Sequence, residues 1–413
     1  MSDTVVMRLL FGLALALASA QLAAATPGAA ELGVTRVATM AIPAAPLASR
    51  AQVDAYLRDT PPADSPLAWL TAGAQRRFVD SIVFGERGVG GMDLGDLRYE
   101  LTRQQAYTLL QLFGAASYAL DLGARTRVRA ASADSAAGTL EPAYDQLVAA
   151  ESLTDGNEAT MARSYQVDFA PLQNARGRQA LGERDMTFLF RATYLVARMT
   201  GAQPYLKDLR DDFAELRRRQ LVDRPHASDF YDALITSGQI EEAKALLKAW
   251  PAIERRPPPS MRMAYRIRNG RPSLWIATPD TRKRELMRFR FNIQAPTQVI
   301  VLASPGCPFS VNAARDIEAE PQLADLFREY GQWVAPPEEV TAFDAVRDWN
   351  QAHPALRLGI AYDRAALPMV RQIETPTFYF LDHGTVVDTA VGWPRGGNLG
   401  AIRRGLHRIG LLP

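Results

Sequence analysis

The sequence predicts an α+β protein of more than one domain, in which a mostly α-helical N-terminal region precedes a C-terminal α/β region built on a central mixed sheet. Apolar residues recur at helical spacing over residues 65–250. From residue 261 onward, short runs of β-branched and aliphatic residues alternate with helical segments. A proline-rich stretch over residues 251–260 separates the two regions and predicts a linker.

Residues 1–25 have the pattern of a signal peptide. Arg8 precedes an apolar run that leads into two A-x-A sites, at residues 18–20 and 23–25. The run is short for a membrane span, so we expect cleavage and no stable membrane insertion afterwards. These features predict an exported protein of the bacterial periplasm. Since Cys307 is the only cysteine, no disulfide can form within the exported chain.

The region that follows is predicted to be a poorly ordered lead-in over residues 26–64, interrupted by a short helix over 52–58. Its Ala- and Pro-rich composition favours little regular structure. The helical domain is then expected over residues 65–250. Within it, Thr102 and Gln105 form the sequence pattern of a capping box at the start of a helix.

Two further helices of this domain show clear signals. Asp185 is predicted to cap a helix that Gly201 ends. The next helix, over residues 205–221, is rich in acids and arginines, which suits a solvated face. We expect its adjacent carboxylates, Asp211 and Asp212, to lie on that face rather than to act in catalysis.

The stretch that carries the chemistry is residues 297–310. Its apolar run over 299–302 predicts a buried strand, and residues 304–306 break that pattern. Pro308 suits the first position of a helix, so Cys307 is expected at the helix N-terminus. Exposed N–H groups and the helix dipole favour a thiolate there, which is the nucleophilic form of cysteine.

The sequence from Cys307 to Ser310 resembles the Cys-x-x-Cys motif of the thioredoxin superfamily, with serine in place of the second cysteine. Downstream, Thr375 and Pro376 precede an apolar run that resembles the family's cis-proline and central strand. The segment between the two motifs is similar to the insertion of secreted TlpA-like members. The resemblance covers about the last third of the chain and implies a thioredoxin-like domain over residues 261–413.

The resemblance and the periodicity together predict the elements of this domain. Expected strands lie over residues 273–278, 286–292, 297–302, 332–334, 356–362, 377–382 and 386–391, and expected helices over 308–317, 341–351, 365–372 and from 398.

Three family features are missing. Ser310 replaces the resolving cysteine, Gly306 replaces the tryptophan before the first cysteine, and Val301 replaces a buried acid on the preceding strand. A protein that shuttles electrons through its own dithiol needs these groups. A monothiol that forms mixed disulfides needs only Cys307, its helix terminus and a substrate groove.

Two functions from different classes follow. In the first, the protein is a monothiol thiol–disulfide exchange or isomerase-like factor, with Cys307 as nucleophile and Ser310 donating a hydrogen bond to the thiolate. Its partners are client proteins with disulfides or thiols. Substrate contacts are then expected from residues on both loops beside the thiol: Pro308, Phe309, Thr375 and Pro376.

In the second, the fold is a redox-inactive scaffold that binds a protein partner without covalent chemistry, and the helical domain serves as an interaction or homodimerisation module. Whether the chain is an enzyme stays open between the two. Neither function calls for a cofactor or a metal, and the net charge of +2 gives no reason to expect nucleic acid. Eleven basic residues lie over residues 255–290, where a charged, solvated sheet edge is favoured over a docking surface.

Overall fold

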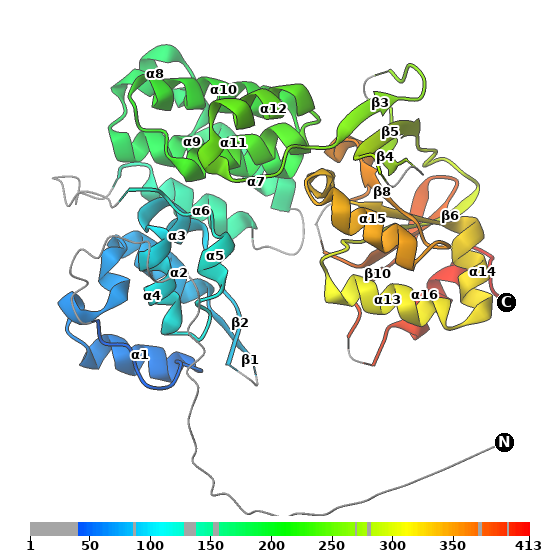
Figure 1. The fold of residues 1–413 in the computed structure, drawn as a ribbon, viewed down its shortest axis with the longest axis horizontal. Coiled ribbons are helices and arrows are strands. Elements are labelled where there is room, and N and C mark those ends of the chain that lie inside the picture. Colours follow the sequence, from blue (N-terminus) through cyan, green and yellow to red (C-terminus); the bar gives the residue numbers. More distant parts are fainter. Residues whose placement is uncertain are drawn as a thin grey trace, which may run out of the picture. The chain divides into compact units, whose positions relative to one another are not determined.

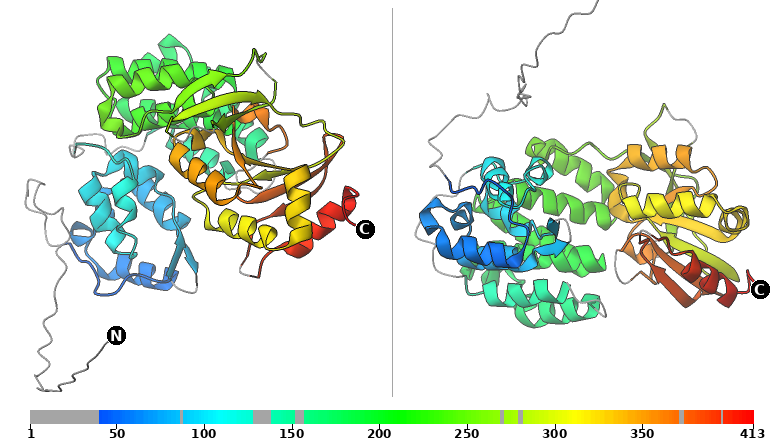
Figure 2. Two further views of the ribbon diagram at one scale, coloured as in Figure 1. Left: turned by 45° about the vertical axis from the view of Figure 1, so that its right-hand side comes forward. Right: turned by 90° about the horizontal axis from the view of Figure 1, so that it is seen from below.

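The computed structural model describes residues 40–85, 88–127, 138–151, 157–268, 271–278, 282–370, 374–394 and 396–413. The signal peptide predicted over residues 1–25 lies outside this part of the chain. Helices dominate the N-terminal half and a sheet the C-terminal half, as Figure 1 and the further views in Figure 2 show. The predicted α+β organisation is therefore confirmed.

The helical region contains, in order, α1 (Arg50–Asp59), α2 (Ala72–Ser81), α3 (Gly95–Glu100), α4 (Arg103–Gln111), α5 (Tyr118–Asp121), α6 (Glu141–Glu151), α7 (Asn157–Asp168), α8 (Ala175–Ala180), α9 (Glu183–Thr200), α10 (Gln203–Arg218), α11 (Arg224–Thr236) and α12 (Ile240–Ala249). A two-stranded antiparallel sheet, β1 (Val83–Gly85) and β2 (Gly88–Gly91), follows α2.

The first part of this region has its own core, which draws on residues 47–124. Helix α1 belongs to it, because Val53 is fully buried and Tyr56 nearly so. The Ser49 side chain caps this helix by accepting a hydrogen bond from the N–H of Gln52. A poorly ordered lead-in is therefore the wrong description of residues 41–64.

The predicted capping box at α4 is present. The N–H of Gln105 donates to Thr102 Oγ1 over 3.3 Å, and the N–H of Thr102 donates to Gln105 Oε1 over 3.0 Å. The prediction for α9 is wrong at its start, since the helix begins at Glu183. Asp185 instead accepts hydrogen bonds from the N–H groups of Thr139 and Leu140, at 3.1 and 3.0 Å, on the approach to α6.

Helix α10 differs from prediction at one carboxylate. Asp211 lies near the surface and pairs with Lys207 at 2.9 Å, as a solvated face requires. Asp212 is fully buried and accepts hydrogen bonds from Gln173 Nε2 at 2.9 Å and Thr193 Oγ1 at 2.8 Å. Burial raises the pKa of Asp212 to about 7.

The C-terminal region is built on an eight-stranded mixed sheet with the order β10-β9-β6-β7-β8-β4-β5-β3. Its strands are β3 (Ser260–Met263), β4 (Ser273–Ala277), β5 (Glu285–Arg290), β6 (Thr297–Leu302), β7 (Gly331–Ala335), β8 (Leu358–Ala361), β9 (Thr377–Asp382) and β10 (Thr385–Val391). Strands β6, β7 and β8 run parallel, whereas β9 and β10 on one side and β4 and β5 on the other pair antiparallel.

Alternate residues of the central strands face two different cores. Val299 and Val301 of β6 belong to the core that also takes in buried residues of α13 (Pro308–Glu318), α14 (Pro321–Tyr330), α15 (Phe343–Ala352) and α16 (Leu399–Arg408). Ile300 and Leu302 point to the other face, where they pack with residues of neighbouring strands and with Phe291 and Leu367. Both faces of β6 are thus covered, which explains its unbroken apolar sequence.

The sheet region departs from prediction in its connections. The helix expected over residues 365–372 is wrong for the described residues, where a single 3-10 turn, η6 (Arg364–Ala366), takes its place. Strand β3 was not expected and pairs in parallel with β5.

One member of the basic segment is also buried. The Nε group of Arg288 donates to Ser273 Oγ at 2.9 Å, and its guanidinium lies 3.3 Å from the ring centroid of Tyr362. The prediction of a solvated sheet edge is therefore wrong for Arg288.

Residues 41–413 form one compact unit. Helix α11 packs against η5 (Pro337–Val340), and the Nε group of Arg364 donates to the carbonyl of Arg198 at 3.3 Å. Because the two regions are in contact, the structure does not separate them at residues 251–260, and the domain boundary there stays a prediction. This segment begins with a 3-10 turn over Pro251–Ile253.

No helix in the described part of the chain is long and apolar enough to cross a membrane.

Candidate thiol site

Cys307 lies at the point where the chain leaves the sheet and enters α13. The turn after β6 is closed by a hydrogen bond from the Cys307 N–H to the Ser304 carbonyl at 3.1 Å. Cys307 is the N-cap residue of α13, with Pro308 at the first helical position, as the sequence predicts. The sulfur therefore lies at the end of the helix where backbone N–H groups lack partners within the helix. The residue is half-buried, so the thiol is neither sealed nor fully exposed.

The proline-bearing loop lies directly opposite. Strand β9 pairs antiparallel with β6, so the segment that enters β9 passes the end of β6 from which Cys307 follows. The Thr375–Pro376 peptide is cis, as the resemblance implies. The Cys307 thiol donates to the Thr375 carbonyl over 3.1 Å, a contact between residues 68 positions apart. The two motifs of the sequence are thus brought together.

Ser310, in the position of the missing second cysteine, is fully buried beneath the thiol loop. Its hydroxyl oxygen accepts a hydrogen bond from the N–H of Ser304 at 3.3 Å. Ser310 therefore holds the turn that precedes Cys307, in addition to any contact with the sulfur.

Opposing influences act on the ionisation of Cys307. Partial burial opposes ionisation, but hydrogen bonds from the Thr375 hydroxyl and from the backbone and hydroxyl of Ser310 favour the thiolate. The donors outweigh burial, and the pKa of the Cys307 thiol is lowered. The thiol's own bond to the Thr375 carbonyl exists only in the protonated state, so this bond is lost when the sulfur ionises.

An apolar surface borders the sulfur. The Phe309 side chain is 53% exposed and that of Val311 is 37% exposed, both on the first turn of α13. Pro308 is also exposed, whereas Pro376 is buried and its carbonyl accepts from the N–H of Gly392 at 2.8 Å. Large apolar side chains left in solvent beside a half-buried thiol suit contact with another polypeptide.

The structure adds one group that the sequence did not reveal. Glu339, in η5, accepts a hydrogen bond from the Ser304 hydroxyl at 2.5 Å. Burial raises the pKa of Glu339, although the bond from Ser304 counteracts it. A carboxyl group with a raised pKa therefore touches the turn before Cys307, while Val301 occupies the strand position of the family's buried acid. The sequence did not reveal Glu339 because its contact depends on the parallel pairing of β6 and β7, which brings the loops after both strands to one edge of the sheet.

Among the described residues, no group of three or more His, Cys, Asp or Glu side chains is placed to hold a metal ion. His383 lies at the turn between β9 and β10 and has a positive φ of 46°.

Comparisons with known proteins add little to this geometry. No family model matches the sequence, and no curated protein matches it. Among solved structures, a thioredoxin-like protein from Bacteroides caccae is similar over 68% of this chain and 98% of its own, at 13% sequence identity and a TM-score of 0.24. A likeness this low carries no argument about fold or function. The residues around Cys307 are therefore the basis for inferring a function.

Proposed function

We propose that this protein is an exported monothiol factor that forms mixed disulfides with client proteins through Cys307. The observation that carries the proposal is the position of the sulfur: half-buried at the N-terminus of α13, 3.1 Å from the carbonyl of Thr375 beside cis-Pro376. Thiolates are stabilised at helix N-termini, and the thiolate is the attacking species. We also propose a TlpA-like thioredoxin fold, which the elements from α14 to β8 inserted between Cys307 and Pro376 support.

The proposed exchange reaction needs no external oxidant or reductant. The Cys307 thiolate attacks one sulfur of a client disulfide, forms a new S–S bond with it, and releases the other sulfur as a thiolate. A thiolate of the same client then attacks the mixed disulfide, forms a different client disulfide and restores the Cys307 thiolate. The net change is isomerisation, with no electrons gained or lost. This route needs no second cysteine, which Ser310 could not provide.

Substrate contacts in this proposal come from both sides of the sulfur. The exposed Phe309 ring would pack against the client chain, and the backbone at Thr375 would pair with it in an extended conformation. Since the Thr375 carbonyl accepts the thiol's hydrogen bond in the free protein, ionisation of Cys307 releases that carbonyl for a client N–H.

Glu339 has a positioning and proton-holding role in the proposal. Its carboxyl fixes the Ser304 hydroxyl, and Ser304 in turn holds Ser310 and the N–H of Cys307 through its backbone. A carboxyl with a raised pKa can accept and return a proton at a higher pH than an ordinary glutamate, a capacity that Val301 cannot supply. The Glu339→Gln variant keeps the contact to Ser304 and removes the titration.

The competing reading is a redox-inactive scaffold that uses the exposed apolar surface of Phe309 and Val311 to bind a partner. In that reading the thiol is incidental, and binding survives its removal. The helical region would serve client binding or dimerisation in either case.

Trapping of clients tests the proposal. The full chain is produced in an exporting host as wild type, Cys307→Ser and Phe309→Ser, free thiols are blocked on lysis, and complexes are compared with and without reductant. We expect reductant-sensitive complexes with the wild type, none with Cys307→Ser, and fewer with Phe309→Ser. If Cys307→Ser retains the same partners as the wild type, the scaffold is correct and the thiol proposal is wrong.

A further inference from the structure

Residues 255–290 carry eleven basic residues against two acids, and the thiol chemistry makes no use of them. The segment forms β3, β4 and β5, which end the sheet on the side away from β9 and β10 (Figure 1). Strands β7, β8, β4 and β5 lie between β3 and β6, the strand that leads to Cys307. The outermost strand, β3, is therefore separate from the thiol site.

Many of these basic side chains have a partner of their own. Arg288 is buried against Tyr362. Arg282 and Lys283 each have an interaction partner. Four more lie 3.0–3.8 Å from a carboxylate: Arg255 with Asp232, Arg256 and Arg284 with Asp344, and Arg262 with Glu285. These seven side chains therefore do not define the sign of a binding partner.

Four arginines remain, and each is exposed without a carboxylate partner among the described residues: Arg266, Arg268, Arg271 and Arg290. Three of them lie on the loop between β3 and β4, and this loop begins and ends beside the fourth. At its start, the N–H of Arg290 donates to Tyr265 Oη at 3.0 Å. At its end, Ser273 is the cross-strand partner of Arg290. The four positive charges are thus gathered at one end of the sheet edge and favour an anionic partner.

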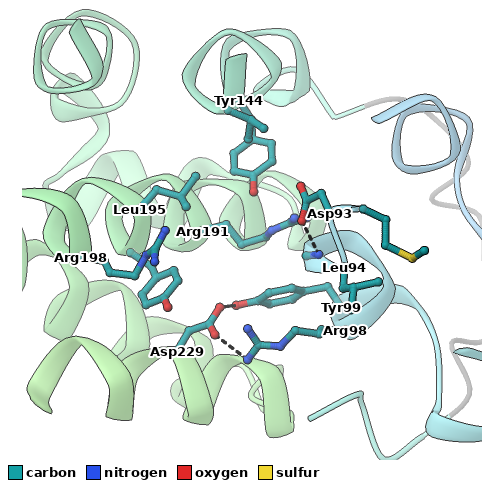
Figure 3. A pocket seen from close by; sticks show the side chains of 13 residues that line it. Asp93, Leu94, Arg98, Tyr99, Tyr144, Arg191, Leu195, Arg198 and Asp229 are labelled. Carbon is teal, nitrogen blue, oxygen red and sulfur yellow. Dashed lines mark hydrogen bonds and ion pairs between the residues drawn. The ribbon is translucent and has the colours of Figure 1, made fainter. Parts of the chain in front are cut away.

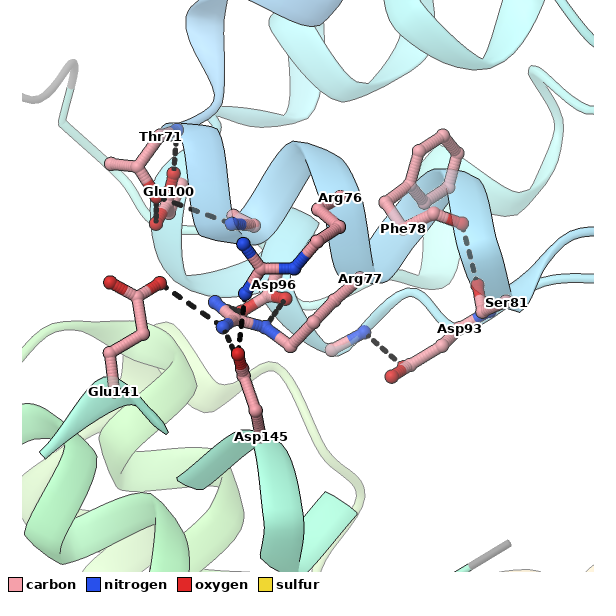
Figure 4. A network of polar contacts seen from close by, with 12 residues as sticks. Thr71, Arg76, Arg77, Phe78, Ser81, Asp93, Asp96, Glu100, Glu141 and Asp145 are labelled. Carbon is pink, nitrogen blue, oxygen red and sulfur yellow. Dashed lines mark hydrogen bonds and ion pairs between the residues drawn. The ribbon is translucent and has the colours of Figure 1, made fainter. Parts of the chain in front are cut away.

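The helical region shows the opposite arrangement of charge. Arg77 pairs with Asp96 at 2.7 Å in the polar network of Figure 4. Arg191 pairs with the same carboxylate at 2.7 Å, beside the pocket in Figure 3. Arg98, which lines that pocket, pairs with Asp229 at 2.6 Å. These arginines bind acids of their own region and tie its helices together, which the four arginines of the sheet edge do not.

Large apolar side chains lie beside the arginines of the sheet edge. Met263 is 61% exposed, Tyr265 45% and Phe289 36%. The rings of Tyr265 and Phe289 meet edge to face with their centroids 6.5 Å apart, and the Arg290 guanidinium lies 5.8 Å from the Tyr265 centroid. Aromatic residues, methionine and arginine are the types enriched in protein–protein interfaces. Charge alone suffices to protect a sheet edge from pairing, so the exposed apolar side chains need another explanation.

The backbone of β3 is open to a further strand. In the described part of the sheet β3 pairs with β5 alone, and the Ser260 N–H donates to the Arg284 carbonyl at 2.8 Å. Successive residues of a strand direct their N–H and C=O groups to opposite sides, so those of Met261 and Met263 face away from β5. An extended polypeptide can bond to such groups by adding a strand to the edge.

We propose that the edge of β3 and the loop after it bind an acidic segment of another protein in an extended conformation. The backbone of this segment pairs with Met261 and Met263, its carboxylates lie near the four unpaired arginines, and its apolar side chains contact the two exposed rings. A second copy of this chain is a poor occupant, because edge-to-edge pairing brings the two sets of arginines together. Nucleic acid and anionic membranes match the charge but not the open backbone groups.

Fluorescence anisotropy tests the proposal with a labelled peptide in which glutamate and valine alternate, titrated with the full chain at low salt. One comparison peptide has lysine in place of glutamate. The other has proline in place of valine, so that its charge is kept but strand pairing is lost. We expect saturable binding of the glutamate–valine peptide that weakens with added salt. Each comparison peptide should bind about tenfold more weakly, because it lacks either the charge or the backbone contacts.

Variants of the chain locate the site. Arg266→Glu combined with Arg268→Glu reverses two unpaired charges and should weaken binding about tenfold. Arg328→Glu combined with Arg408→Glu is the matched control, because it changes the net charge equally at two exposed arginines outside the sheet edge. Met263→Pro removes an outward N–H but no bond to β5, and loss of one backbone hydrogen bond should weaken binding about fivefold. Met263→Ala keeps that N–H and should weaken binding less.

Circular dichroism and the urea midpoint establish that each variant is folded. Absence of saturable binding of the glutamate–valine peptide to the wild type overturns the proposal. Equal binding of the proline peptide, or equal binding by Met263→Pro and Met263→Ala, means attraction by charge alone and overturns strand addition. Unchanged binding by the folded Arg266→Glu/Arg268→Glu variant places the peptide elsewhere and also overturns the proposal. Tighter binding of a single-stranded oligonucleotide, or of vesicles that contain phosphatidylglycerol, contradicts the assignment of an acidic polypeptide.

Discussion

Replacing Ser310 by alanine should change both the acidity of Cys307 and the stability of the fold. The Ser310 hydroxyl hydrogen-bonds the sulfur in favour of the thiolate, and a hydrogen bond to a charged group contributes about 1.5–3 kcal/mol. Since one pKa unit corresponds to 1.36 kcal/mol, full loss would raise the pKa of the thiol by about 1–2. Cys307 is only half-buried, so water replaces part of the lost bond and the lower end, about 1, is expected.

The stability effect has a separate cause. Ser310 is fully buried and accepts the N–H of Ser304 at 3.3 Å, so alanine leaves that donor without its partner. The expected loss in the free energy of unfolding is about 1 kcal/mol, increasing toward about 3 kcal/mol if water cannot reach the N–H. Val311→Ala is the matched control, since it shortens the next side chain of the same helix turn without removing a polar contact.

The assay for acidity is the rate of iodoacetamide alkylation as a function of pH, with urea unfolding measured on the same samples. Since the chain has one cysteine, the reaction reports on Cys307 alone. If Ser310→Ala stays folded and its alkylation profile coincides with those of the wild type and Val311→Ala, the assigned hydrogen bond to the thiolate does not exist.

Three further outcomes are expected. Because burial raises the pKa of Asp212 to about 7, wild-type stability should fall as pH rises from about 4 through 7. The urea midpoint of Asp212→Asn minus that of the wild type should therefore be larger at pH 8 than at pH 5. Parallel pH profiles of the two proteins would contradict this. A methyl group on Gly405 would lie 2.3 Å from the ring of Phe380, so Gly405→Ala should lower the free energy of unfolding by about 1–3 kcal/mol. Gly400, on the same helix, has no such contact, so Gly400→Ala should raise the free energy of unfolding by about 0.5–1 kcal/mol. Thermal unfolding measures both effects. Because the pKa of the Cys307 thiol is lowered, the wild type should be stabilised relative to Cys307→Ser at a pH above the thiol pKa of the unfolded chain. This advantage should disappear as the pH falls through the thiol pKa of the folded protein. A difference between the two urea midpoints that stays constant with pH would refute the prediction.

Local signals explain what the sequence could predict. The apolar run of β6, the break after it and Pro308 all act within a few residues, so they located Cys307 at the start of a helix. Thr102 and Gln105 likewise form a cap through neighbours in sequence. The contact between Cys307 and Thr375 spans the domain, and only the resemblance to a family implied it.

Predictions failed where a distant element supplies the partner. Asp212 has the local sequence of a solvated helix face, but Gln173 and Thr193 from other elements bury and bind it. Asp185 suits a helix N-terminus, yet its carboxylate serves the approach to α6 instead. No periodicity within one segment reports such pairings, because they depend on how the helices pack.

The same limit applies to the groups around the two sites. Glu339 reaches Ser304 across 35 residues of sequence. Arg290 lies beside the loop that carries Arg266 and Arg268 because β4 and β5 pair, and no spacing in the sequence shows which basic residues stay without a carboxylate. These sites became visible only when the tertiary arrangement was known.

The central claim is that the fold activates Cys307 as a thiolate. The most direct measurement is the rate of mixed-disulfide formation with a small peptide disulfide at pH 6.5, followed by mass spectrometry, for the folded chain and for the same chain in urea. At a pH below the pKa, each unit by which the pKa falls raises the thiolate fraction about tenfold and lowers the nucleophilicity of the thiolate only about threefold, so the lowered pKa of Cys307 should make the folded chain react faster. An equal or slower rate for the folded chain would contradict activation by the fold.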